Sequence, residues 1–346
     1  MNSTSASRRN FIKKTAATSL ALSVSSSAFP WHYTKEQNGK RIGIIGLDTS
    51  HSTAFTKALN DQNADPVFNG YRVVAAYPHG SKDIESSVKR IPGYTDEVKK
   101  YGVTIVDSIP KLLDQTDVIL LETNDGRLHL EQILPVLKAG KRVFIDKPIA
   151  ASLRDTIAIF EAARTYKVPV FSSSSLRYMA SAQEVVAGKA GKVLGADTYS
   201  PAHLEKTHPD LVWYGIHGVE TLFTVMGTGC KSVVRTHTEN TDVVTGLWDD
   251  KRIGTFRGMR SGKLDYGGMA YCENGIQPLG PYDGYNPLLM QIIQFFQTGE
   301  PPVKAEETLE IMAFMEAADE SKRLGGAVVT LESMFKKAQE ASRKIK

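Results

Sequence analysis

The chain of 346 residues is long enough for two folded domains, and its 41% hydrophobic content excludes a disordered protein. The first 28 residues contain Arg8, Arg9, Lys13 and Lys14 and no acidic residue, so they account for the whole formal charge of +4. Of 42 lysines and arginines, 38 remain and balance 38 acidic residues, which gives no electrostatic reason to expect nucleic acid or an anionic membrane as partner. We therefore expect a small-molecule ligand.

The N-terminal segment resembles a twin-arginine export signal. It reads Ser7-Arg8-Arg9-Asn10-Phe11-Ile12-Lys13 and continues into a mildly apolar run of Ser, Thr and Ala over residues 15–29. The run is too short and polar for a permanent membrane span. The alternative is a basic leader on a cytosolic protein. We interpret residues 1–40 as export signal and linker and expect a periplasmic protein, which is consistent with a cofactor inserted before export.

Residues 41–172 alternate between β-branched runs and helical patterns. Strands are predicted at 41–45, 71–76, 103–106, 118–121, 143–145 and 168–171, and helices at 54–59, 94–101, 109–115, 128–139 and 152–166. Strands that alternate with helices at this spacing indicate a parallel sheet covered on both faces, with ligand at the carboxyl ends of the strands. The prediction is a Rossmann-type dinucleotide-binding domain in an α/β protein.

Residues 173–346 follow a different pattern. Strands are predicted at 236–248, 252–257 and 263–271, and helices at 305–324 and from 331 onward. This favours an α+β domain with an open, mostly antiparallel sheet that binds substrate, and an exposed sheet face would make the chain a homo-oligomer. Cys230 and Cys272 are the only cysteines, so no disulfide framework holds the fold, and both one bridge and two separate thiols stay open.

The turn after the first strand departs from the G-x-G-x-x-G pattern of dinucleotide-binding folds. It reads Gly46-Leu47-Asp48-Thr49-Ser50-His51, so only the first glycine is present. A carboxylate at ~4 Å from a phosphate costs about 4 kcal/mol, and a helix N-terminus offsets only ~0.5 to 2 kcal/mol of that. Asp48 is therefore expected to turn away, or the pocket holds something other than a pyrophosphate.

No carboxylate follows the second strand where one would bind the ribose hydroxyls. His79, Ser81 and Lys82 are there instead and could receive a ribose phosphate, which favours NADP over NAD, although a solvated loop is the more ordinary interpretation. The predicted cofactor contacts are Gly46, Asp48, Thr49, Ser50, His51, Thr123, Asn124, Asp146 and Lys147.

The fifth predicted strand lies in the segment Lys138-Ala-Gly-Lys-Arg-Val-Phe-Ile-Asp-Lys147-Pro148. The end of this segment resembles the Glu-Lys-Pro motif of the glucose-fructose oxidoreductase, inositol dehydrogenase and rhizopine-catabolism (Gfo/Idh/MocA) family. Asp146 stands in place of the glutamate. Further matching segments are His129-Leu-Glu-Gln, Leu176-Arg177-Tyr178 and Pro301-Pro-Val-Lys-Ala-Glu-Glu. The resemblance covers nearly the whole mature chain. It implies that Lys147 lies in the substrate and nicotinamide cleft, and a lysine at the carboxyl end of a parallel strand is aimed there on physical grounds too. The alternative is a surface ion pair with Asp146.

The same resemblance implies an Asp-x-x-x-His motif whose histidine is the general acid/base. His217 matches, but Trp213 stands in the aspartate position, so Tyr214 or Asp210 would have to orient the imidazole. A core histidine bonded to backbone is the alternative. The predicted catalytic residues are Lys147, His217 and Tyr214, and the predicted substrate contacts are Arg177, His208, Asp210 and Trp213.

Three weaker features stay open. Arg177 could bind substrate or pair with an acid across the domains, and the stretch from Tyr266 to Tyr285 could be a sugar platform or sheet core. His203, His208 and His217 match no compact ligand spacing, so no metal site is expected.

These observations predict an oxidoreductase that transfers a hydride between a tightly held nicotinamide, NAD or NADP, and a sugar or polyol. One alternative is a lyase, hydratase or epimerase of keto-sugars that uses the same Lys147 and His217. A non-catalytic sugar-binding protein is the other.

Overall fold

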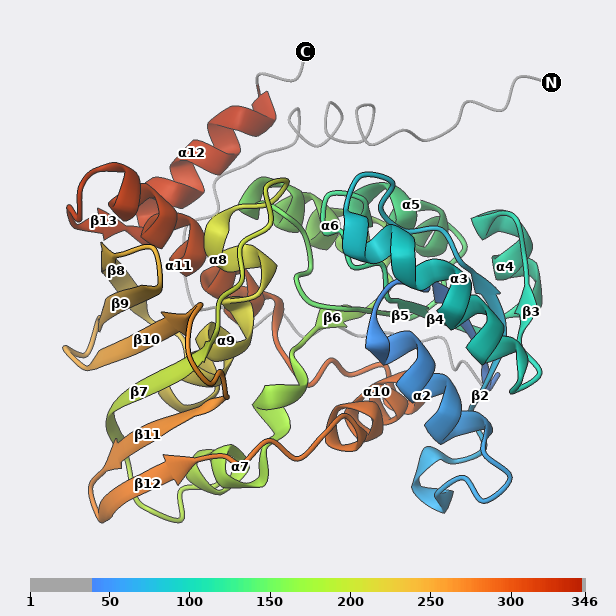
Figure 1. The fold of residues 1–346 in the computed structure, drawn as a ribbon, viewed down its shortest axis with the longest axis horizontal. Coiled ribbons are helices and arrows are strands. Elements are labelled where there is room, and N and C mark those ends of the chain that lie inside the picture. Colours follow the sequence, from blue (N-terminus) through green and yellow to red (C-terminus); the bar gives the residue numbers. More distant parts are fainter. Residues whose placement is uncertain (1–38, 344–346) are drawn as a thin grey trace.

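The computed structural model describes residues 39–343 (Figure 1); the predicted export signal lies outside them. The first sheet has six parallel strands in the order β3-β2-β1-β4-β5-β6. Its strands are β1 Arg41–Ile45, β2 Arg72–Tyr77, β3 Thr104–Ile105, β4 Val118–Leu121, β5 Val143–Ile145 and β6 Val170–Ser172. The order reverses between β1 and β4, and a parallel sheet binds ligands at the carboxyl ends of the strands flanking such a switch point. The predicted Rossmann-type sheet is confirmed.

Helices cover both faces of this sheet. They are α2 Ser50–Asn60, α3 Glu85–Lys99, α4 Ile109–Gln115, α5 His129–Lys138 and α6 Leu153–Tyr166. The predicted N-cap of α6 is present, since the Ser152 hydroxyl accepts a hydrogen bond from the Asp155 amide at 3.2 Å. The predicted start of α3 at residue 94 was wrong, because the helix begins at Glu85 and continues through Pro92.

The second sheet has seven strands in the order β12-β11-β7-β10-β9-β8-β13, and only the β7–β10 pair is parallel. The strands are β7 Val193–Pro201, β8 Cys230–His237, β9 Thr241–Trp248, β10 Ile253–Met259, β11 Gly267–Cys272, β12 Gly275–Leu279 and β13 Val329–Thr330. The open, mostly antiparallel sheet is confirmed. The single strand predicted at 236–248 was wrong: β8 and β9 form a hairpin there.

One face of the second sheet is covered by α9 Ile216–Met226 and α11 Ala305–Arg323 (Figure 1). The other face is open and carries exposed large apolar side chains at Leu194, Tyr199, Leu247, Ile253, Met269, Tyr271 and Ile276. Cys230 and Cys272 are buried free thiols. Within residues 39–343, no helix has the length and apolar character needed to span a bilayer.

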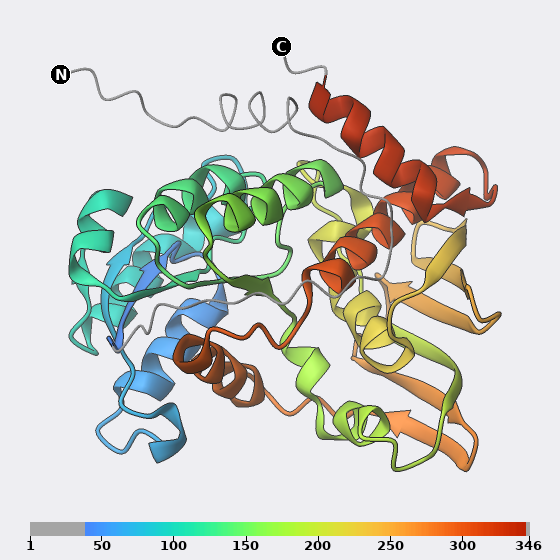
Figure 2. The same ribbon diagram turned by 180° about the vertical axis from the view of Figure 1, so that it is seen from behind.

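The chain returns to the first sheet after β12. It does so through α10 Asn286–Thr298. The remaining helical segments of the described chain are η1 Pro66–Phe68, η2 Ser175–Tyr178, α7 Ala180–Val186, α8 Asp210–Trp213 and α12 Leu331–Arg343. Helix α10 lies beside α2 (Figure 2), and the Phe295 ring contacts Phe171 with centroids 4.9 Å apart. The Arg142 guanidinium donates to the carbonyls of Phe296 and Gln297 at 2.6 and 3.1 Å. The segment that leads into α10 therefore passes from the second sheet across the carboxyl edge of the first.

Candidate active site

Lys147 follows β5, and His217 is held by Ser174, which follows the neighbouring strand β6. Lys147 and His217 are 8% and 7% exposed. Burial, together with the positive charge of Lys147, lowers the pKa of His217 well below its ordinary value, so the imidazole is neutral near pH 7. The Lys147 side chain forms no hydrogen bond or ion pair with any residue in 39–343. Its backbone amide, rather than its ammonium, bonds Asp146 at 2.8 Å.

The group that orients His217 is Ser174, which follows β6. The Ser174 hydroxyl lies 2.7 Å from His217 Nδ1 and accepts a second bond from the Leu176 amide. When Nδ1–H donates to this oxygen, the lone pair of Nε2 is left to accept a proton. The expectation that Tyr214 or Asp210 orients the imidazole is therefore corrected.

A row of half-buried tyrosines joins His217 to His51; we call Tyr214, Tyr266, Tyr282 and Tyr285 the tyrosine wall. The rings follow one another with centroids 4.5 to 6.0 Å apart from His51 through Tyr285, Tyr282 and Tyr266 to His217. Tyr214 contacts His217 at 5.1 Å, and its hydroxyl lies 3.0 Å from that of Tyr266. Flat rings of this kind can stack on the apolar face of a sugar.

Three ionisable side chains lie together at the carboxyl edge of the first sheet: His51 in the first turn of α2, Glu122 after β4 and Asp146 after β5. His51 Nδ1 lies 3.0 Å from Asp146 Oδ1 and 3.8 Å from Glu122 Oε2. Burial raises the pKa of Glu122 well above its ordinary value, and the neighbouring Asp146 charge adds to this. Burial also acts to raise the pKa of Asp146, but the neighbouring His51 and Lys147, with the hydrogen bonds from the His51 ring and the Lys147 amide, prevail and lower it to about 2. Glu122 was missed by the sequence analysis.

The β1–α2 turn fits an anion. Gly46 has φ +89°, and a Cβ there would lie 2.5 Å from the Thr123 amide, so the turn needs glycine. Helix α2 has no side-chain cap and no acid in its first turn. The buried hydroxyls of Thr49 and Thr123 have no hydrogen-bond partner in the part of the chain that the structure describes. Free amides and orphaned hydroxyls at a helix N-terminus suit a phosphate. Ser50 bonds the Tyr285 hydroxyl at 3.1 Å.

Asp48 turns away from that helix, as the sequence analysis expected, but not onto the helix amides. Its carboxylate accepts from the amides of Asn124 at 2.9 Å and Ser81 at 3.4 Å. Burial raises its pKa to about 6. Ser81 is thereby held inside the protein and also bonds Asp83, whereas His79 and Lys82 are exposed. Of His79, Ser81 and Lys82, which were considered as a ribose-phosphate site, only His79 and Lys82 are therefore exposed enough to fill that role.

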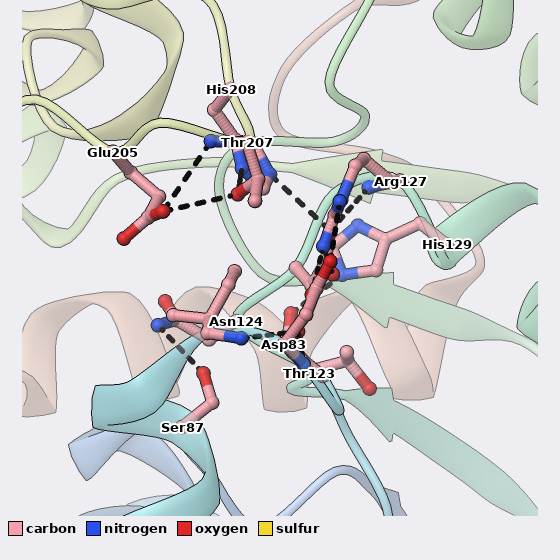
Figure 3. A network of polar contacts seen from close by, with 12 residues as sticks. Asp83, Ser87, Thr123, Asn124, Arg127, His129, Glu205, Thr207 and His208 are labelled. Carbon is pink, nitrogen blue, oxygen red and sulfur yellow. Dashed lines mark hydrogen bonds and ion pairs between the residues drawn. The ribbon is translucent and has the colours of Figure 1, made fainter.

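The loop after β4 is held by a network that reaches the second half of the chain (Figure 3). His208 Nε2 lies 3.3 Å from Asp125 Oδ1, and Asp125 also accepts from Arg127, whose guanidinium bonds Asp83 at 3.1 Å. The Asn124 side chain approaches Ser87, and the His129 ring bonds the Thr123 carbonyl at 2.6 Å. Trp213 covers His208, with ring centroids 4.8 Å apart. His208 and Trp213 therefore help to fix the loop, and their contact with substrate stays a prediction.

Two other predicted substrate contacts are occupied by ion pairs. Arg177 bonds Glu220 at 2.8 Å and lies 2.7 Å from Glu307. Of the two roles considered for Arg177, substrate binding or pairing with an acid, the structure shows the pairing with acids, on α9 and α11. Asp210 accepts from Lys322 at 2.7 Å and from Arg235 at 3.0 Å. Both side chains hold α9, α11 and the second sheet together.

Residues 40–174 match the model of the oxidoreductase family with an NAD-binding Rossmann fold, GFO_IDH_MocA. Over 109 residues the chain is 30% identical to a 1,5-anhydro-D-fructose reductase from Ensifer adhaerens, an alignment that covers 29% of this chain and 33% of that protein. The chain thus matches about a third of the length of this curated relative.

Solved structures resemble the chain over most of its length. A probable dehydrogenase from Thermotoga maritima superposes with a TM-score of 0.68 at 18% identity, covering 85% of this chain and 99% of that one. A scyllo-inositol dehydrogenase from Lactobacillus casei, with NAD(H) and scyllo-inositol bound, gives 0.67 at 16% identity and covers 85% and 99%. A myo-inositol 2-dehydrogenase from Lactobacillus plantarum gives 0.67 at 16% identity and covers 84% and 99%. At such identities the likeness establishes a shared fold.

Proposed function

We propose that this chain, whose residues 40–174 match the model of the Gfo/Idh/MocA oxidoreductase family, transfers a hydride between a nicotinamide and a secondary alcohol or ketone of a sugar or polyol. The observation that carries the proposal is that Lys147 follows β5 while Ser174, which follows the neighbouring strand β6, holds the His217 imidazole, so both groups lie at the carboxyl edge of the parallel sheet. The reductase and the inositol dehydrogenases among its relatives act on substrates of this class by their names.

In the direction of oxidation, the neutral His217 accepts the hydroxyl proton at Nε2, while Ser174 holds the ring through Nδ1. The Lys147 ammonium donates a hydrogen bond to the same oxygen and stabilises negative charge that develops there. The tyrosine wall orients the sugar ring. When bound, the nicotinamide supplies the hydride acceptor. In the direction of reduction, imidazolium returns the proton.

The cofactor residues would be the α2 amides and the hydroxyls of Thr49 and Thr123 toward phosphate, with Gly46 allowing close approach. NAD and NADP both stay within the proposal, since His79 and Lys82 are exposed beside β2 and no acid takes the ribose position. An exported enzyme meets no free nicotinamide pool, so the cofactor would stay bound and be recycled between two substrates.

One observation favours a second candidate, a non-redox lyase or epimerase of keto-sugars. Asp48 and His51 stand where dinucleotide-binding turns have their second and third glycines, and both side chains are buried in the pocket region. In that reaction Lys147 and His217 would act as an acid/base pair on a carbon next to a carbonyl, without hydride transfer.

The experiment that separates them is mass spectrometry of the small molecules released from the purified chain, combined with turnover of a panel of sugars, inositols and keto-sugars. Released nicotinamide and formation of a ketone from a carbinol support hydride transfer. Turnover of a keto-sugar by a preparation free of nicotinamide would refute it. Binding without turnover, unchanged in Lys147→Ala, would identify a sugar-binding protein.

We also propose export to the periplasm through the twin-arginine segment at residues 7–13, and assembly of the chain into a homo-oligomer. The open face of the second sheet supports assembly, because it carries several exposed large apolar side chains, and clusters of such side chains mark interaction sites. A fusion of residues 1–40 to a reporter tests export: it should reach the periplasm, and Arg8→Lys with Arg9→Lys should retain it inside the cell.

A further inference from the structure

A cluster of three ionisable side chains that hydride transfer does not use lies at the carboxyl edge of the first sheet: His51, Glu122 and Asp146. Glu122 and Asp146 directly follow the neighbouring strands β4 and β5, and His51 lies in the first turn of α2, the helix after β1. One ligand atom from each, an imidazole nitrogen or a carboxylate oxygen, lies within 4.8 Å of the other two. The cluster is therefore built by the first sheet and the helix that follows β1.

Glu122 is buried, and its carboxylate forms no hydrogen bond with the described residues. It is 0% exposed, and neither of its carboxylate oxygens has a hydrogen-bond partner within residues 39–343. Asp146, also 0% exposed, has one oxygen, Oδ2, in the same condition when the described residues are considered. The Thr49 hydroxyl is near Glu122 but makes no hydrogen bond of ordinary geometry to it. Buried polar groups in folded proteins are paired or coordinate metals, because an unpaired one costs ~1 to 3 kcal/mol or more.

Protonation of Glu122 alone would not resolve this. It would remove the charge, but the new O–H would still lack an acceptor, and the second oxygen would still lack a donor. A cation placed between Glu122, Asp146 and His51 would pair the orphaned oxygens of Glu122 and Asp146, and would replace the hydrogen bond of 3.0 Å between His51 Nδ1 and Asp146 Oδ1. A cation suits the cluster because two of the three groups are carboxylates.

The spacing suits a metal ion. Ligand atoms at about 2.1 Å from a common centre lie roughly 3.0 to 3.4 Å apart for octahedral or tetrahedral angles. His51 Nδ1 is 3.0 Å from Asp146 Oδ1 and 3.8 Å from Glu122 Oε2, and all three ligand atoms lie within 4.8 Å of one another, so metal binding requires the Glu122 carboxylate to move inward. One imidazole with two carboxylates is a donor set for Zn²⁺ or Mn²⁺ rather than for Mg²⁺ or Ca²⁺, which prefer oxygen alone.

We propose that His51, Glu122 and Asp146 bind a divalent transition-metal ion, Zn²⁺ or Mn²⁺, with at least one coordination position open toward Lys147 and His217. Three protein ligands and an open position are the arrangement of a metal that acts on a bound oxygen. The ion also neutralises the carboxylates next to the phosphate-binding end of α2, which removes their repulsion of an anionic ligand. The site does not depend on the proposed hydride transfer.

The test is metal binding to the full chain, stripped with chelator and freed of nicotinamide and substrate. Titration calorimetry with Zn²⁺ and with Mn²⁺ should give about one equivalent of one of them. Glu122→Gln and His51→Ala should weaken that binding by at least about 100-fold. Glu316→Gln is the matched control, because Glu316 is a half-buried carboxyl on α11 that accepts from the Leu153 amide and does not belong to the cluster.

The absorption spectrum of the Co²⁺-substituted chain should show a protein-bound, low-symmetry ion, and Glu122→Gln should abolish it. Wild-type chain that binds neither Zn²⁺ nor Mn²⁺ above the level of a chelator-treated blank overturns the proposal, whatever the variants do. So does equal affinity in wild type, Glu122→Gln and His51→Ala. The metal-binding test does not measure catalysis. A chain that binds metal but transfers no hydride would therefore contradict the proposed function and would still support the metal site.

Discussion

Substitution of Ser174 by alanine probes the orientation of the general base. The Ser174 hydroxyl is buried and lies 2.7 Å from His217 Nδ1. Its removal leaves Nδ1–H unsatisfied in the interior, which costs about 1 to 3 kcal/mol. If the cost falls on the transition state, kcat drops roughly 5- to 150-fold. KM should change by less than about threefold, because Ser174 is a positioning residue that acts through His217.

The same hydroxyl accepts from the Leu176 amide, so Ser174→Ala also loses a cap of the η2 helix, worth about 0.5 to 2 kcal/mol of stability. The free energy of unfolding must therefore be measured, and kcat compared at a temperature where the variant is folded. Ser174→Thr keeps the hydroxyl and should recover most of kcat. Ser200→Ala is the control, since that buried hydroxyl bonds only the Pro201 carbonyl among the described residues. A folded Ser174→Ala with kcat within twofold of wild type would refute the reasoning.

Four further predictions follow from individual contacts. Lys147→Met removes a positive charge that lowers the pKa of His217, so NMR titration should show the imidazole pKa moving toward its ordinary value. Turnover should fall by about 100-fold or more. An unchanged imidazole pKa would contradict the proximity of Lys147 and His217. Burial raises the Asp48 pKa from 3.8 to about 6, so this carboxyl withdraws roughly 3 kcal/mol of stability as the pH rises from about 4 through 6. In urea unfolding across that range, Asp48→Asn should lose this part of the pH dependence, and an unchanged profile would show the carboxyl to be solvated. Asp210→Asn breaks pairs with Lys322 and Arg235 and should cost about 1 kcal/mol of unfolding free energy without raising KM; a raised KM would restore its predicted contact with substrate. Ile253→Lys, on the open sheet face, should shift the oligomer toward monomer in light scattering, whereas a wild-type monomer would end that proposal.

The first sheet was predictable because its signals are local. Short apolar runs bounded by turns gave β4 and β5 at their observed bounds, and the rule that parallel sheets bind ligand at strand ends selected Lys147. The same rule applies to Glu122, which directly follows the apolar run of β4. The carboxylate of Glu122 could therefore have been predicted as a site residue from the sequence.

Other parts of the site depend on contacts between distant residues. Ser174 lies in a run of four serines, and nothing in that run indicates that it bonds a histidine 43 residues away. The partners of Arg177 and Asp210 are equally remote in sequence, so their type suggested substrate binding while their surroundings make them structural. The return of α10 to the first sheet carries no local pattern either, because an apolar helix can pack against any apolar surface.

The most direct measurement follows the hydrogen itself. A polyol or sugar that the chain turns over is prepared with deuterium on the carbinol carbon, and the nicotinamide recovered from the protein is analysed by mass spectrometry after a single turnover. Hydride transfer predicts one deuterium on the nicotinamide ring and none released to water. Label that appears in solvent, with an unlabelled or absent nicotinamide, would mean that Lys147 and His217 move protons only.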